Sequence, residues 1–304
     1  MSINTWAEKQ EAKLIRLNPA ESLGDAVMKR IYLTMKYWKH YFQYIRPNKQ
    51  EMDALKALRG SKKGKSAFIL AGGPSLKKLD YEKVARYQRE EGFEIFGINS
   101  FISKIKQVYD LRLDYAVFSD PRHFGLLLDE TTEKRRAEIK EDIKAVIDDE
   151  VALFAPMRFK GLGKYRTVYH FPDFCDIRTD NVEDITKPLG YYSLSTFKAL
   201  SIALYCGYDT IYLCGLDNDY FKTVSVNENN EAFFEDNHFY DDITVTRRLA
   251  DNPIYKRMGQ FLFNCSLTFE FLEKFSPYNI VNLDKEGLVS NFTKKHNLDI
   301  YRKD

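Results

Sequence analysis

The 304-residue sequence has few cysteines and little net charge, and each shortage excludes a class of protein. Its four cysteines form no C-x-x-C pair, so we predict no zinc site and expect free thiols in a reducing compartment. A net charge of +2 creates no global field for nucleic acid, and we predict no nucleic-acid partner. Apolar runs stay shorter than the ~20 residues that span a bilayer. Because the first residues contain no apolar signal core, we expect a cytoplasmic protein.

Several catalytic signatures are also missing. The sequence has no G-x-G-x-x-G, nucleophile elbow, metalloprotease motif or internal repeat. Residues 60–66 resemble the end of a G-x-x-x-x-G-K-[ST] phosphate loop, but Arg59 stands where that motif requires glycine. The motif also follows a strand, whereas this segment precedes one. We therefore interpret residues 61–66 as a linker.

The sequence does contain a regular alternation of strand and helix patterns. Hydrophobic residues are 44% and charged residues 30%, which is typical of a globular protein. The alternation predicts βαβ units, and hence an α/β, Rossmann-like fold with a mostly parallel sheet and helices on both faces. The predicted strands are 68–70, 94–98, 114–118, 151–154, 167–171, 211–216 and 278–283, and the predicted helices are 81–91, 132–147, 193–206 and about 253–272.

Residues 1–64 form a predicted helical extension, with helices at about 6–17 and 21–45. The second helix carries an apolar stripe at helical spacing, and basic residues stand between its members. Residues 21–46 suit an anionic membrane surface. The alternative is a helix packed on the body of the protein or on a partner subunit, and we expect a homo-oligomer. Residues 65–304 then form the catalytic domain.

Polar or glycine residues follow four of the predicted strands. The first strand ends at Gly72-Gly73-Pro74-Ser75, and the others end at Asn99, Asp120 and Asp217. Ligands of an open parallel sheet bind outside the carboxyl ends of its strands, so these ends predict a ligand site. The glycine turn leads into a helical segment and offers backbone N–H groups to a phosphate. The alternative is an ordinary strand-to-helix connection.

Five polar residues are candidates for chemistry. His238 can take a proton at neutral pH. Asp217 and Asp219 form a D-x-D pair that can hold Mg²⁺ against a diphosphate, or a charged turn. Asp120 is a candidate metal ligand, ribose acceptor or helix cap. Ser195 stands at the start of a helix, where it can cap the helix or receive phosphate.

The segment after Asp219 has no clear helix or strand pattern. It begins at the predicted ligand site and is long for a structureless loop. We predict that residues 218–252, approximately, form a lid over the site.

With these residues in place, the chain resembles the bacterial lipooligosaccharide sialyltransferases (glycosyltransferase family forty-two). It also resembles the wider domain family of 6-hydroxymethylpterin diphosphokinase, which many surface-polysaccharide clusters carry. The resemblance covers about residues 65–292. It is carried by Ala71–Leu76, Gly97–Phe101, Phe118–Pro121, residues 195–217 and Asp236–Tyr240.

The resemblance implies a glycosyltransferase that uses a nucleotide-activated sugar, such as CMP-sialic acid or a relative, and a glycan or glycolipid acceptor. It implies an inverting mechanism with His238 as base and with no required metal or other cofactor. Tyr220 is a loose match to the phosphate-binding tyrosines of the sialyltransferases. The residues implied to bind the nucleotide are Gly72, Gly73, Pro74, Ser75, Asn99, Asp120, Ser195 and Asp217.

Two alternatives come with the resemblance. The wider family implies an ATP- and Mg²⁺-dependent diphosphotransferase acting on a pterin-like alcohol, with Asp120, Asp217 and Asp219 as metal ligands. A non-catalytic nucleotide-binding scaffold is the other. Two positions depart from the sialyltransferase pattern: Gly72 and Asp120 each stand where those enzymes have asparagine.

Overall fold

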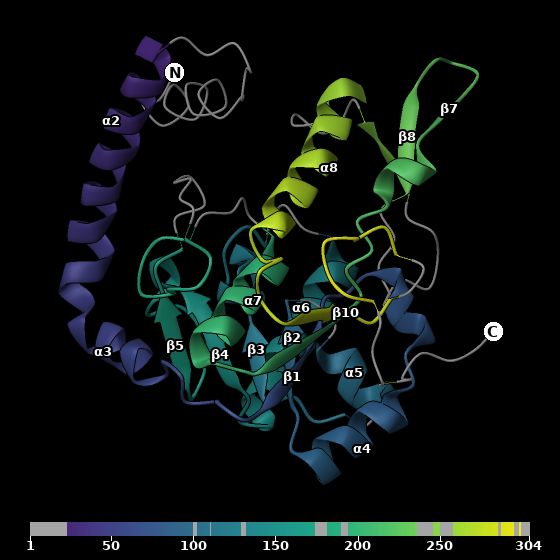
Figure 1. Ribbon diagram of the computed structural model, residues 1–304. Coiled ribbons are helices and arrows are strands. Elements are labelled where there is room, and N and C mark those ends of the chain that lie inside the picture. The colour runs from purple at the N-terminus through teal and green to yellow at the C-terminus, as the bar shows by residue number, and fades with distance from the viewer. Residues whose placement is uncertain are drawn as a thin grey trace.

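The computed structural model describes residues 23–99, 102–109, 111–128, 132–173, 181–189, 194–235, 246–249, 258–284, 287–294 and 298. Seven strands form one parallel sheet in the order β10-β6-β1-β2-β3-β4-β5 (Figure 1). This confirms the predicted α/β, Rossmann-like class. The strands are β1 (Ser66–Leu70), β2 (Glu94–Ile98), β3 (Tyr115–Val117), β4 (Ala152–Pro156), β5 (Val168–Phe171), β6 (Thr210–Cys214) and β10 (Ile280–Asn282).

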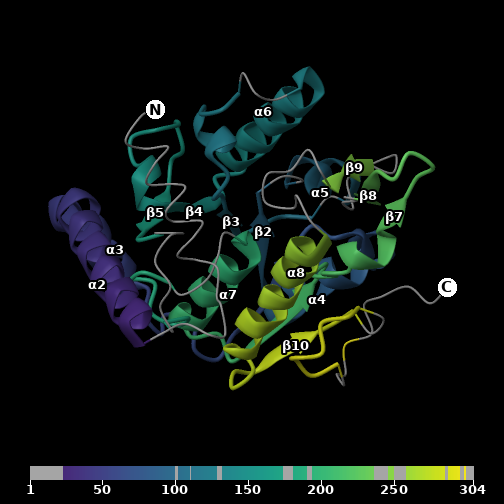
Figure 2. The same ribbon diagram turned by 90° about the horizontal axis from the view of Figure 1, so that it is seen from above.

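Helices cover both faces of the sheet (Figure 2). Alternate residues of each strand point to opposite faces, so the sheet supports two separate cores. Ile69 of β1 belongs to the core beneath the helices α3, α7 and α8, whereas Phe68 belongs to the core beneath α4, α5 and α6. The helices are α3 (Lys49–Ala57), α4 (Tyr81–Glu91), α5 (Ile102–Tyr109), α6 (Glu133–Asp148), α7 (Ser195–Cys206) and α8 (Met258–Glu273).

Local sequence signals set the ends of these helices. The Asp80 carboxylate accepts a hydrogen bond from the Lys83 N–H at the start of α4, and Thr132 caps α6 in the same way. Gly207 ends α7 with a φ of +84°, a conformation that favours glycine. The cysteine prediction is confirmed for Cys206 and Cys214, which are buried free thiols. Burial raises the pKa of the Cys206 thiol to about 12.

The N-terminal part begins with α2 (Leu23–His40), continues through a π-helical turn, η1 (Tyr41–Ile45), and a short 3₁₀ turn, η2 (Arg46–Asn48), and then enters α3. The predicted helix over 21–45 is confirmed from Leu23 onward, and the predicted helix over 6–17 lies outside the described residues. Met52 and Leu55 of α3 are buried in the core shared with α7. The extension is therefore joined to the sheet domain through α3.

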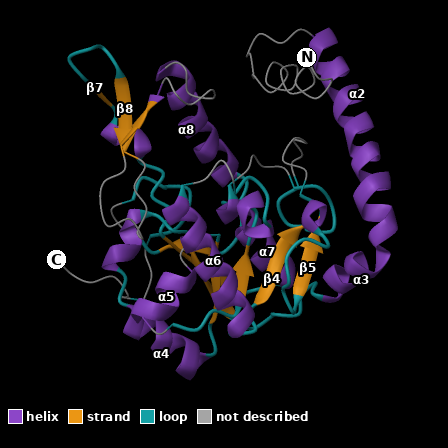
Figure 3. Cartoon of the chain, turned by 180° about the vertical axis from the view of Figure 1, so that it is seen from behind, coloured by secondary structure: helices purple, strands orange, loops and turns teal. Residues whose placement is uncertain are grey.

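The segment after β6, for which the sequence shows no clear helix or strand pattern, contains regular structure, and the lid over about residues 218–252 stays a prediction. A 3₁₀ turn, η6 (Tyr220–Thr223), leads into a three-stranded antiparallel sheet of β7 (Ser225–Val226), β8 (Ala232–Glu235) and β9 (Thr246–Arg248). Phe234 and Leu249 form a small core of their own. Figure 3 shows this sheet beside α8, beyond the carboxyl ends of the main strands. The strands are only two to four residues long, so the sequence contains no long periodic pattern that would predict them.

Strand order places a topological switch point between β1 and β6. The chain builds outward from β1 through β5, and then returns through α7 to β6, which pairs with the opposite edge of β1. Connections on the two sides of such a point lie on opposite faces, which opens space outside the carboxyl ends of the two strands. The loops after β1 and β6 therefore meet where a ligand site is expected.

Candidate functional site

The glycine loop after β1 and the loop after β6 are bonded directly to each other. The Gly73 N–H donates to the Gly215 carbonyl (2.8 Å), and the Ser75 N–H donates to Asp217 Oδ2 (3.3 Å). A Cβ atom at position 73 would lie 2.0 Å from Asp217 Oδ2 and 2.5 Å from the Gly215 oxygen. Glycine at position 73 is what lets the two loops approach this closely.

This contact changes what the glycine loop offers to a ligand. Two of its N–H groups already donate within the protein, and the segment that follows, η3 (Pro74–Lys78), is a short 3₁₀ turn. The Ser75 hydroxyl is buried and has no hydrogen-bond partner among the described residues. The loop thus presents backbone surface to a ligand, with fewer free N–H groups than the sequence suggested, and the Ser75 hydroxyl is buried within it.

Asp217 is the titratable centre of this contact. Burial raises the pKa of its carboxyl to about 7, and the charges of Asp284 and Asp219 add to the rise, while the hydrogen bond from Ser75 opposes it. Asp217 therefore exchanges a proton near neutral pH, and its side chain can donate as well as accept a hydrogen bond there. Asn218 beside it is buried, and its amide nitrogen has no partner among the described residues.

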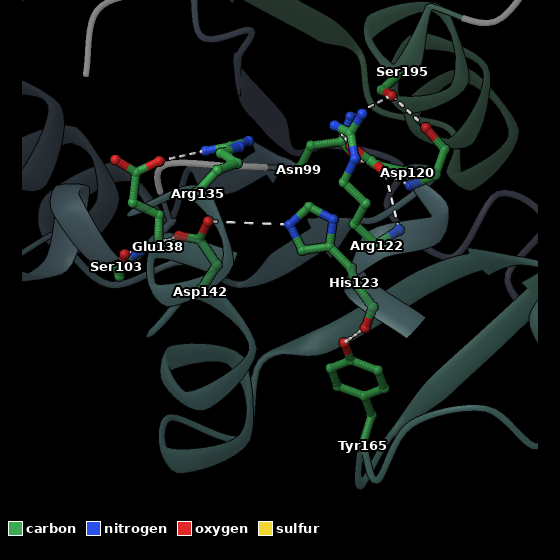
Figure 4. A network of polar contacts seen from close by, with 11 residues as sticks. Asn99, Ser103, Asp120, Arg122, His123, Arg135, Glu138, Asp142, Tyr165 and Ser195 are labelled. Atoms are coloured by element: carbon green, nitrogen blue, oxygen red, sulfur yellow. Dashed lines mark hydrogen bonds and ion pairs between the residues drawn. The ribbon is translucent and has the colours of Figure 1, made fainter. Parts of the chain in front are cut away.

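Asn99 joins the ends of β2 and β3 to the start of α7 (Figure 4). Its Oδ1 accepts from the N–H groups of Ser119 (2.9 Å) and Asp120 (3.4 Å), and its Nδ2 donates to Ser195 Oγ (2.7 Å). Ser119 Oγ and Ser195 Oγ are also hydrogen-bonded. Asn99 has a φ of +48°, which asparagine tolerates better than most residues. Three predicted site residues, Asn99, Asp120 and Ser195, thus form one network.

Asp120 has a local role as well as a position in the site. Its carboxylate accepts from the Arg122 N–H (3.0 Å) at the start of η4 (Pro121–Phe124) and pairs with the Arg122 guanidinium (3.2 Å). The helix cap that we predicted as one alternative for Asp120 is therefore present. The ion pair places a guanidinium at the carboxyl end of β3, where an anionic ligand would meet it.

The N-terminus of α7 has no side-chain cap. The residue before the helix is Leu194, whose side chain cannot accept a hydrogen bond, although its carbonyl accepts one from the Phe197 N–H (3.1 Å). Lys198, one turn into the helix, is 1% exposed and pairs with Asp173 beyond the end of β5 (2.6 Å). Uncapped N–H groups, the helix dipole and the Ser195 hydroxyl together make this terminus suited to an anion.

Other predicted residues do not join these contacts or lie outside the described structure. Asp219 pairs with Lys222 (3.9 Å) and is partly exposed. Tyr220 begins η6, and His238 lies outside the described residues. In the part of the chain that the structure describes, no group of three or more His, Cys, Asp or Glu residues is placed to hold a metal ion.

Three site residues were missed by the sequence analysis. Asp173 follows β5 just as Asp217 follows β6, so the rule that selected Asp217 also applies to it. Lys198 is a lone charge in an otherwise apolar helix, which signals a buried ion pair. Nothing in the sequence indicated that Arg122 belongs to the site, because an arginine after a turn is usually a solvated surface residue.

A second polar cluster lies behind Asp120, and Figure 4 draws it beside the first. His123 is buried and stacks on Phe118, and its Nε2 is 4.0 Å from Asp142 Oδ2. Burial lowers the pKa of His123 to about 4, so the imidazole is neutral at physiological pH. Tyr165 donates to the His123 carbonyl (2.6 Å), and Asp142 accepts from Ser103. This cluster holds η4 in place beneath the site.

The fold defines an α/β protein of the Rossmann-like class. A comparison with solved structures finds the sialyltransferase CstII from Campylobacter jejuni in complex with a substrate analogue, cytidine-5'-monophosphate. The two sequences are 16% identical, the match covers 80% of this chain and 91% of that chain, and the TM-score is 0.36. No family model and no curated protein matches the chain. The ligand class therefore has to be argued from this chain's own residues.

Proposed function

We propose that the protein is a glycosyltransferase that binds a nucleotide-activated sugar at the switch point and transfers the sugar to a hydroxyl group. One observation carries the nucleotide part. Asn99 bonds the ends of β2 and β3 to the start of α7, and Asp217 bonds the loop after β6 to the loop after β1, so two bonded groups lie at the carboxyl ends of the strands. Ligands of parallel sheets bind at this position.

The proposed phosphate position is the N-terminus of α7. Its first turn has no side-chain cap, the Ser195 hydroxyl lies there, and Asn99 fixes that hydroxyl from the side. The nucleoside would then extend toward Gly73 and Asp217, where Asp217 can donate or accept a hydrogen bond near neutral pH. The motif resemblance supports cytidine as the base, and sialic acid or a related sugar as the group transferred.

His238 is the proposed general base, on the strength of the motif resemblance. It would take the proton of the acceptor hydroxyl while the oxygen attacks the anomeric carbon, and the nucleotide would leave with the bonding electrons on its phosphate. Help of this kind is worth about 10²–10⁴-fold in rate. The proposed acceptor is a hydroxyl of a surface glycan or glycolipid.

A thermal-shift series tests the nucleotide site. The full chain is heated with CMP, CDP, UDP, GDP or ATP, each with and without Mg²⁺. We expect CMP to raise the midpoint without metal, because a ligand at a hundred times its Kd stabilises the folded state by about 2.7 kcal/mol. Ser195→Ala should weaken the shift, and Ser225→Ala, on an exposed strand, should not. A shift with ATP and Mg²⁺ alone would instead support the diphosphotransferase.

Turnover tests the reaction class. We expect slow hydrolysis of CMP-sialic acid by the wild-type chain, retained in EDTA and reduced at least a hundredfold in His238→Ala. His296→Ala is the matched control and should keep full activity. If CMP binds and His238→Ala leaves the rate unchanged, the catalytic assignment fails while the nucleotide site stands.

A further inference from the structure

Helix α2 and the π-helical turn η1 expose a continuous apolar stripe, which we name the outer face. It consists of Met28, Ile31, Met35, Trp38 and Phe42, whose side chains are 49–68% exposed. Their spacing of three and four residues places all five on one side of the helix. Exposing an apolar stripe this long to water is unfavourable, so we expect a membrane or another protein surface to cover it.

The opposite side of the same segment faces the body of the protein. His40 and Tyr44 are half-buried there, and Tyr44 and Ile45 pack against the core that contains α7. Figures 1 and 3 show α2 standing beside β5 at the edge of the molecule. The segment is therefore anchored through η1, at the carboxyl end of α2, and the outer face is exposed.

The charge around the outer face is mostly positive, since Asp25 is the one acidic residue in the sequence of α2. From residue 26 to residue 50 the sequence has six Lys or Arg and no Asp or Glu. Lys39 and Arg46 are exposed, and the Arg46 guanidinium lies 5.5 Å from the Phe42 ring centroid. Burial lowers the pKa of Lys36 to about 8, and the charge of Lys39 adds a smaller part of the decrease.

This charge favours an anionic lipid surface over a second copy of the chain. Two copies paired through the outer face would bring Lys39 and Arg46 against one another with no acidic partner from residues 26–50. A bilayer with anionic headgroups satisfies both features at once. Basic side chains reach the headgroups, while Trp38 and its apolar neighbours enter the boundary between headgroups and acyl chains.

We propose that α2 docks the protein on anionic membranes by lying in the interface, with the outer face buried and Lys39 and Arg46 against the headgroups. No helix among the described residues is long and apolar enough to cross a bilayer, so this contact is peripheral. The proposal does not depend on the glycosyltransferase assignment.

Co-sedimentation of the full chain with vesicles tests the proposal. We expect binding to vesicles in which about one third of the lipid is phosphatidylglycerol, and at least tenfold weaker binding to pure phosphatidylcholine. Met35→Gln with Trp38→Gln should weaken binding at least tenfold, because it removes buried apolar area. Lys39→Gln with Arg46→Gln should weaken it about tenfold to thirtyfold on the anionic vesicles alone.

The control is Val226→Gln with Leu262→Gln, which changes two exposed apolar residues far from α2 and should leave binding unchanged. Equal thermal midpoints show that all variants are folded. Wild-type binding that survives Met35→Gln with Trp38→Gln would overturn the proposal. So would absence of vesicle binding by a dimer that the same double variant converts to a monomer, because the outer face would then belong to a second copy.

Discussion

Asn99 shows how one residue can hold a site together through both its backbone conformation and its side-chain amide. Its φ of +48° lies in the left-handed region, and its amide bonds two neighbouring segments, the end of β3 and the start of α7. We predict that Asn99→Ala is less stable than Asn99→Gly by about 1 kcal/mol, because alanine is strained in this conformation. Both variants should lose a further 1–3 kcal/mol, approximately, since the Ser119 N–H loses its partner.

Urea unfolding followed by circular dichroism measures both variants. Ser225→Ala serves as the surface control and should unfold like the wild type. Equal stabilities of Asn99→Ala and Asn99→Gly would show that the backbone at this position is unstrained.

Asp217 makes stability depend on pH in an unusual direction. Burial raises its folded pKa to about 7 from an ordinary value of 3.8, so the folded carboxyl holds its proton more tightly than the unfolded one. This stabilisation is full below pH 3.8 and is lost as pH rises through 7. We predict that Asp217→Asn gains stability relative to the wild type between pH 4 and pH 8.

Thermal unfolding at several pH values measures this difference. The control is Glu228→Gln, at an exposed position between β7 and β8, which should track the wild type at every pH. A difference in thermal midpoint between Asp217→Asn and the wild type that is the same at every pH would contradict the raised pKa of Asp217.

At the scale of the elements, the close contact between the loops after β1 and β6 depends on glycine at position 73, because glycine has no side chain. Gly73 has a φ of −74°, which alanine adopts easily, so any effect of Gly73→Ala comes from the collision of its Cβ with Asp217 and the Gly215 carbonyl. We predict a loss of about 1–3 kcal/mol in unfolding free energy. Because the backbone collision remains, adding Asp217→Ala should restore only part of the loss, and full restoration would contradict the geometry.

The buried pair of Lys198 and Asp173 ties α7 to the end of β5. Lys198→Met leaves a buried carboxylate without its nearest cation, so we predict a loss of about 3–5 kcal/mol in urea unfolding. Adding Asp173→Leu should recover most of that loss, since the uncompensated charge is gone. Lys56→Met breaks an exposed pair with Asp53 and should change little. A double variant as unstable as Lys198→Met would contradict this account.

The elements of the main sheet were predictable because each strand is short, apolar and followed by a polar turn. Glu94–Ile98 and Tyr81–Glu91 have the predicted bounds. The sequence also selected Asn99, Asp120 and Ser195, because topology brings strand ends together. It did not show that Ser75 and Asp217 bond to each other, since contacts between loops depend on three-dimensional approach. Short strands such as β7 were not predicted, because two or three residues are too few to show a periodic pattern.

For the whole molecule, stability is unevenly distributed. β1 lies between two parallel neighbours and is buried on both faces, whereas the sheet of β7, β8 and β9 rests on a core of two buried residues. We predict that the amide hydrogens of β1 and β6 exchange with deuterium most slowly. Those of β8 should exchange much faster, because a smaller part of the structure has to open. Peptide-resolved exchange mass spectrometry measures both, and equal protection would contradict the separation.

The position of β6 beside β1 also has a consequence for the chain as it is synthesised. Leu70 of β1 pairs with Cys214 of β6, so an interior strand of the sheet has an unpaired edge until the sequence between the two residues has been made. At synthesis rates of roughly 5–20 residues per second, that edge of β1 stays unpaired for on the order of ten seconds. An exposed edge of apolar strand is a template for wrong pairing. The nascent chain is therefore most vulnerable to aggregation during that interval, and a chaperone that covers β1 would act then.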